Sequence, residues 1–159
     1  MIDRPKTLVV GIGSPHGDDQ AGWLLIERLS SYQLRDVSLR KAAVPHNLFD
    51  WTDDCTALHV VDACPIEDDL HRIEVRDQLS MARVNKLSPD KSSHDLGVAT
   101  VIDLGRSLGV LPHKIIVWAI PGTEFEPGQP VTTLCQQQID QCVVRIAGEL
   151  GSESRCDAT

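Results

Sequence analysis

Long apolar runs and clusters of positive charge are both missing from this 159-residue sequence. Its longest apolar runs have the length of a β-strand, far below the roughly 20 residues that a membrane-spanning helix needs. The opening stretch MIDRPKTLVV lacks the hydrophobic core of a signal peptide. The formal net charge is −8, and no patch of Lys and Arg is present to attract phosphate backbones. We therefore expect a cytoplasmic protein that binds neither nucleic acid nor membranes.

The cysteines also lack the spacings that signal a scaffold or a metal knuckle. They are five in number, which is odd, and no two have CxxC spacing, so neither a disulfide framework nor structural zinc is indicated. Cys135 and Cys142 fall on the apolar face of an expected helix, where cysteine packs as a small buried residue. The metalloprotease motif HExxH is absent, and we see no familiar arrangement around a nucleophile.

Short apolar stretches alternate with helical patterns along the chain. Strands are predicted at 7–12, 37–43, 57–61, 72–75 and 114–120, and helices at 19–32, 95–108 and from the threonines at 132–133 to about Leu150. Strands that are apolar on both faces are typical of a parallel sheet covered on both sides. The sequence thus predicts an α/β fold, a three-layer sandwich with a mostly parallel, twisted five-stranded sheet and helices on both faces. It forms one domain, 1–150, followed by a flexible tail, 151–159.

Acidic and imidazole side chains come where these strands end. The stretch VVGIGSPHGDDQAGW places Asp18 and Asp19 at the start of a helix, Asp62 ends the third strand in HVVDAC, and SSHDLG carries His94 into another helix. Each residue alone is explained about as well by capping or turn formation. Ligands of an open parallel sheet bind outside the carboxyl ends of its strands. Their joint placement therefore predicts a functional site at that edge.

Two kinds of ligand, a nucleotide and a metal ion, are candidates for this site. Gly11, Gly13 and Gly17 have the spacing GxGxxxG, which differs from the dinucleotide fingerprint GxGxxG. Two aspartates at the following helix start would also repel a pyrophosphate, which needs that positive end. Nucleotide binding is therefore rejected in favour of a metal ion.

Asp19, Asp62 and His94 together would offer two carboxylates and one imidazole. Mixed oxygen and nitrogen donors suit a first-row transition metal better than calcium or structural zinc. Three donors leave coordination positions open, so another molecule can supply the remaining ligands.

Four segments, GIGSPHGDDQAG, VVDA, SHDLG and WAIPGTEFEPGQP, resemble in order the hydrogenase maturation endopeptidases. The resemblance runs from Leu8 to about Leu150. These proteases remove the C-terminal extension of the nickel-iron hydrogenase large subunit after nickel insertion. The resemblance implies a nickel-dependent endopeptidase whose partner is the nickel-loaded large-subunit precursor, with nickel carried by that precursor and not bound permanently.

The same resemblance implies metal-ligand roles for Asp19, Asp62 and His94 and suggests Asp18 as a catalytic base. Ser14 departs from the family, which generally has Asn there, and the loop before the acidic pair is one residue shorter. That shortening leaves open whether Asp18 or Asp19 points inward, and it brings His16 near the site as a further possible ligand.

Two other functions remain open at this point. A non-cutting relative would bind a metallated partner as a checkpoint or chaperone through the same residues. A receiver-type phosphoacceptor domain also has an acidic pair after its first strand. It needs a lysine at the end of its fifth strand, where WAIPGTEF has none.

Overall fold

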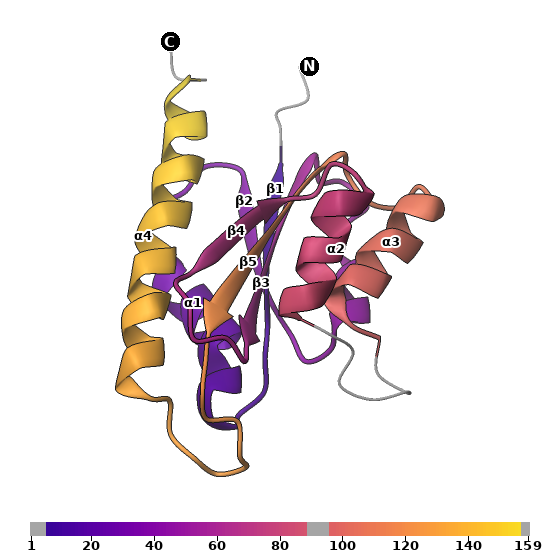
Figure 1. Cartoon of the computed structure of the whole chain (residues 1–159). Helices are drawn as coiled ribbons and strands as arrows, with labels where there is room; N and C mark the ends of the chain where they lie inside the picture. The colour runs from indigo at the N-terminus through magenta and orange to yellow at the C-terminus, as the bar shows by residue number, and fades with distance from the viewer. Residues whose placement is uncertain (1–5, 89–95, 157–159) are drawn as a thin grey trace.

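The computed structural model describes residues 6–88 and 96–156, and within them five strands form one sheet (Figure 1). The strands are β1 (Thr7–Ile12), β2 (Val37–Ala42), β3 (Ala57–Cys64), β4 (His71–Glu74) and β5 (Lys114–Pro121). Every strand predicted from an apolar run is confirmed, although β3 continues past Val61. β1 and β3 are buried along their whole length, which explains why their sequences carry no alternation of polar residues.

The strands lie in the order β2-β1-β3-β5-β4, and all neighbours are parallel except β4 and β5. A parallel connection needs a crossover of a dozen or more residues. Only residues 65–70 separate β3 from β4, so the chain turns back and β4 becomes an antiparallel edge strand. The carboxyl ends of the other four strands meet at one edge of the sheet, where Gly11 of β1 pairs with Val61 of β3.

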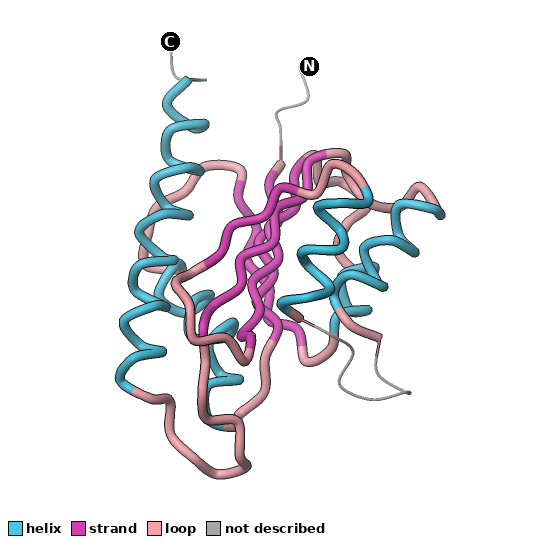
Figure 2. The backbone as a smooth tube through the Cα atoms, in the orientation of Figure 1, coloured by secondary structure: helices cyan, strands magenta, loops and turns pink. Residues whose placement is uncertain are grey.

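Helices cover both faces of the sheet, which confirms the predicted three-layer sandwich (Figures 1 and 2). Helices α1 (Ala21–Leu29) and α4 (Thr133–Cys156) pack on one face, and α2 (Gln78–Leu87) and α3 (Val98–Ser107) pack on the other. Successive residues of a strand point to opposite faces. Val9 accordingly joins the core under α1 and α4, and Leu8 and Val10 join the core under α2 and α3.

The first helix starts later than the sequence predicts. Residues Gly17–Gln20 form a 3-10 turn, η1, and the α-helix itself runs from Ala21 to Leu29. It lies unusually close to β1, because a Cβ atom on Gly11 would come within 2.0 Å of the Gly22 carbonyl oxygen. Glycine at both positions lets the two backbones meet, and this contact fixes where the η1 turn sits.

Two helical segments escaped the sequence analysis, and one helix is longer than predicted. The 3-10 segment η2 (Pro45–Asp50) and α2 were both missed. The available signal for α2 was Asp77, whose side chain accepts the Ser80 N–H at 2.9 Å as an N-cap. α4 continues to Cys156, although the sequence predicted that it ends near Leu150.

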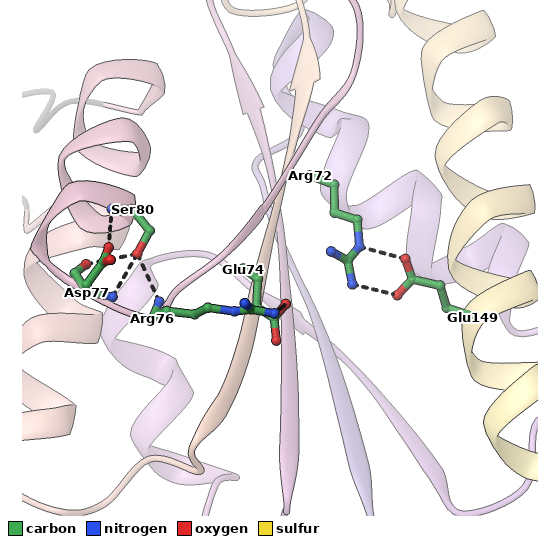
Figure 3. A network of polar contacts seen from close by, with 6 residues as sticks. All are labelled: Arg72, Glu74, Arg76, Asp77, Ser80 and Glu149. Carbon is green, nitrogen blue, oxygen red and sulfur yellow. Dashed lines mark hydrogen bonds and ion pairs between the residues drawn. The ribbon is translucent and has the colours of Figure 1, made fainter.

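The edge strand β4 is tied to α4 by a two-pronged ion pair (Figure 3). Arg72 donates from Nε to Glu149 Oε1 at 2.6 Å and from Nη2 to Glu149 Oε2 at 3.2 Å. Its guanidinium carbon also lies 5.6 Å from the ring centroid of the buried Trp118. These contacts hold an edge strand that has a single neighbour. Within the described ranges, no helix combines the length and the apolar character needed to cross a bilayer.

Candidate functional site

Asp19 and Asp62 line the same cavity at the carboxyl edge of the sheet. Asp62 stands one residue beyond the Gly11–Val61 pair and is 5% exposed. Asp19 lies in η1, which follows β1 after a four-residue loop, and is partly exposed. The cavity has a volume of about 120 Å³ and opens between the end of β1, the loop after β2 and the start of α3. Two carboxylates on one small cavity provide two of the donors that the sequence predicts.

The orientation of Asp62 is set by a residue that the sequence analysis missed. Ser88, which follows α2 and is buried, donates its hydroxyl proton to Asp62 Oδ2 at 2.9 Å. The signal available in the sequence was its position just ahead of the segment that carries His94. A residue that hydrogen-bonds a metal-binding carboxylate, without contacting the metal itself, keeps that carboxylate in one orientation.

His94 lies outside the described residues, as part of 89–95. Ser88 before that segment and Leu96 and Gly97 after it all line the cavity that holds Asp19 and Asp62. Within 6–88 and 96–156, no group of three or more His, Cys, Asp or Glu side chains has the geometry of a metal site. The three-residue ligand set therefore stays a prediction.

Asp18 is turned away from this cavity and is fully buried. Its Oδ2 accepts the N–H of Thr123 at 2.8 Å, the N–H of Glu124 at 3.1 Å and the hydroxyl of Thr132 at 3.0 Å. Its Oδ1 accepts the Thr132 N–H at 2.7 Å. Burial alone would raise the pKa of Asp18, but the backbone and hydroxyl donors together bring that pKa below its ordinary value.

A carboxylate whose charge is stabilised in this way is a poor proton acceptor. The contacts of Asp18 therefore favour a structural role over the catalytic role that the sequence suggested. The shortened loop left open whether Asp18 or Asp19 points into the site. Asp19 lines the cavity, whereas Asp18 is hydrogen-bonded to the loop 122–132.

Asp18 fastens the loop 122–132 to the η1 turn. The loop adds backbone hydrogen bonds of its own, because the Gly17 N–H donates to the Gln129 carbonyl at 2.9 Å. Gly17 has a φ of +53°, and a Cβ atom there would lie 2.3 Å from the Glu124 carbonyl oxygen, so only glycine fits. Thr132 ends the loop and caps α4, since its Oγ1 accepts the Cys135 N–H at 3.2 Å.

This loop carries Phe125 to a second cavity, of about 260 Å³, which also includes Asp19 in its wall. Ser14, His16, Ala63 and Pro65 complete that wall. A third cavity, of about 370 Å³, follows beyond Pro65, between the β3–β4 link and the first turns of α4. Its rim includes the acidic stretch 67–69. The first two cavities share Asp19 in their walls.

Nucleophile motifs do not provide a different site. The stretch GRSLG at 105–109 has the letter spacing GxSxG, which the sequence analysis overlooked. It lies at the end of α3, whereas a nucleophile elbow requires a turn from strand to helix.

Cys135, near the site, is not activated as a nucleophile. Burial is the main cause that raises the pKa of Cys135 to about 12, and the nearby Asp18 charge is the second, so Cys135 stays a thiol. Cys135 and Cys142 are both buried, which confirms their predicted packing role.

No protein-family model matches the sequence, and no curated protein matches it significantly. Solved structures do match. The hydrogenase maturating endopeptidase HybD from Escherichia coli superposes with a TM-score of 0.72 at 23% identity over 93% of each chain. An endopeptidase from Escherichia coli studied in solution gives 0.75 at 24% identity, also over 93% of each chain. This chain has the fold of the hydrogenase maturation endopeptidases.

The nickel-iron hydrogenase maturation protease HycI from Thermococcus kodakarensis is a more distant neighbour with this endopeptidase fold. It gives a TM-score of 0.64 at 18% identity over 92% of each chain. The resemblance drawn from the sequence motifs is thus confirmed for the fold.

The strand order of this protein differs from that of a receiver-type phosphoacceptor domain. A receiver has the doubly wound order 2-1-3-4-5 with parallel strands. Here β5 lies between β3 and the antiparallel β4. The last lysine of the sequence, Lys114, stands at the amino end of β5, opposite the edge where a phosphoryl group would bind.

Proposed function

We propose that this protein is a nickel-dependent endopeptidase that removes the C-terminal extension of a nickel-iron hydrogenase large-subunit precursor after nickel insertion. The observation that carries the proposal is the shared cavity of Asp19 and Asp62, at the carboxyl edge of a sheet with the fold of maturation endopeptidases. The solved neighbours include a hydrogenase maturating endopeptidase and a nickel-iron hydrogenase maturation protease, and these relatives suggest the substrate class.

Nickel enters this proposal as part of the substrate, held by the precursor. Asp19, Asp62 and His94 are the proposed protein ligands. The ligand role of His94, which lies outside the described residues, rests on the resemblance of its sequence segment. An open set of two carboxylates and one imidazole binds a free ion weakly, but it can recognise an ion that arrives with ligands of its own. Such a site detects whether the precursor holds nickel before it is cleaved.

Once bound, the metal would polarise the scissile carbonyl or activate a water molecule. The chain's own residues position the reactants. Ser88 fixes the Asp62 carboxylate, and Asp18 holds the loop that carries Phe125 to the adjoining cavity. In this scheme Asp18 is a positioning residue. The cytoplasmic location expected from the sequence stays a prediction.

The test is intact-mass analysis of the purified nickel-loaded precursor after incubation with this protein. We expect loss of a C-terminal segment with the wild type and no loss with Asp62→Asn or His94→Ala. Asp53→Asn makes the same chemical change as Asp62→Asn at an exposed loop position, and it should cleave normally. Circular dichroism melting checks that every variant is folded.

Three results would separate the alternatives. Normal processing by Asp62→Asn or His94→Ala would remove that residue from the ligand set. A wild type that binds the nickel-loaded precursor without shortening it would be the non-cutting checkpoint or chaperone. A wild type that neither binds nor shortens the precursor would refute the proposed substrate class.

A further inference from the structure

The cavity beside the proposed metal site has the walls of a side-chain pocket. Ala63, Pro65 and Phe125 form its apolar part, and Ser14, His16 and Asp19 form its polar part. Its volume of about 260 Å³ is below the range of roughly 300–1,000 Å³ that is common for whole small-molecule ligands. Pro65 is exposed and Phe125 is partly exposed, so this hollow reaches the surface. It has room for one side chain of a larger partner.

Asp19 belongs to this cavity and to the cavity that holds Asp62. A peptide that brings its scissile carbonyl to a metal on Asp19 and Asp62 therefore has its neighbouring residue beside the second cavity. Consecutive Cα atoms are only 3.80 Å apart across a trans peptide. Resting on the proposed function, we propose that this cavity is the substrate subsite for one apolar side chain directly next to the cleaved bond.

The main wall of this subsite is held rigidly. A Cβ atom on Gly122 would lie 2.9 Å from Asp18 Cβ and 2.9 Å from Phe125 Cζ, so the phenyl ring packs directly over Gly122 and beside Asp18. The four hydrogen bonds to the Asp18 carboxylate fix the loop on both sides of Phe125, at 123–124 and at Thr132. Because this wall is already ordered before the substrate binds, little conformational entropy is lost when it contacts a substrate side chain.

Phe125 is therefore the specificity-determining residue of the subsite. An apolar wall favours a larger aliphatic side chain over alanine because more apolar surface leaves water. One methylene group in an enzyme pocket changes discrimination by roughly 10- to 200-fold. Removing the ring of Phe125 should take away most of that discrimination and leave the metal ligands in place.

The experiment uses the full chain and nickel-loaded precursors. The cut is first located by mass, and the residues on its two sides are then replaced in turn by Leu, Ala or Asp. At one of these positions we expect Leu to exceed Ala in kcat/KM by at least about tenfold and Asp to be the poorest. Phe125→Ala should bring the Leu-to-Ala ratio close to one at that position. Leu108→Ala removes a side chain that is 63% exposed at the end of α3, and it should keep the wild-type ratio.

Three outcomes would overturn the subsite. If the wild type cuts the Leu, Ala and Asp precursors equally at both positions, the proposed function stands and the subsite does not exist. If Phe125→Ala slows every precursor by the same factor and keeps the Leu-to-Ala ratio, Phe125 is a structural residue and not a specificity residue. A wild type that cuts no precursor refutes the proposed function, and the subsite falls with it.

Discussion

Replacing Asp18 by asparagine tests whether this carboxylate holds the loop 122–132 in place. Four donors point at its two oxygens, three at Oδ2 and the Thr132 N–H at Oδ1. Asparagine keeps one acceptor oxygen and turns the other into an NH₂ group. In its better orientation the amide oxygen takes the place of Oδ2, and the NH₂ group then faces the Thr132 N–H at a distance where one of the two must move.

The cost follows from the number of hydrogen bonds that change. One charge-assisted hydrogen bond is lost, and a buried N–H is left facing another donor, which together cost about 2–4 kcal/mol. The three remaining bonds become neutral and weaker. For a chain of this length, we expect Asp18→Asn to lower the melting temperature by about 5–15 °C. Asp53→Asn, at an exposed position, should melt with the wild type.

The contribution of Asp18 to the stability of the fold depends on pH in a predictable direction. The pKa of Asp18 is lowered in the folded protein, so its contribution to stability is complete above the unfolded-state pKa near 4 and is lost as the pH falls through the folded-state value. Urea unfolding at pH 7 and at pH 3 should therefore show the gap between wild type and Asp18→Asn becoming smaller at low pH. A variant as stable as the wild type at pH 7, or a gap that grows on acidification, would refute the reasoning.

Two further predictions concern residues that support the site and the sheet. Ser88→Ala removes the donor to Asp62 and should lower the free energy of unfolding by about 1.5–3 kcal/mol and slow processing, with Ser88→Thr recovering part of the rate; unchanged processing in a folded Ser88→Ala protein would count against this role. Glu149→Gln breaks the paired contact to Arg72 and should cost about 1 kcal/mol in urea unfolding with cleavage unaltered. A loss of cleavage at full stability would contradict it.

The central strands were predictable because each is buried on both faces, and such strands read as apolar runs. The short α2 was missed since its N-cap pair, Asp77 and Ser80, is a local signal that apolar periodicity does not capture. The antiparallel direction of β4 was also absent from the prediction. It follows from the short link at 65–70 and from pairing with β5, which lies some 40 residues further along the chain.

By itself the sequence determined the α/β class, the positions of the strands and the strand ends on which the acidic residues lie, because these depend on local apolar patterns and turn residues. Only the tertiary structure decided what the neighbouring aspartates do. Asp18 and Asp19 are adjacent and chemically identical in the sequence, so no local pattern separates them. Their difference comes from the loop 122–132, more than a hundred residues away, whose donors surround Asp18, while Asp19 borders the cavity it shares with Asp62.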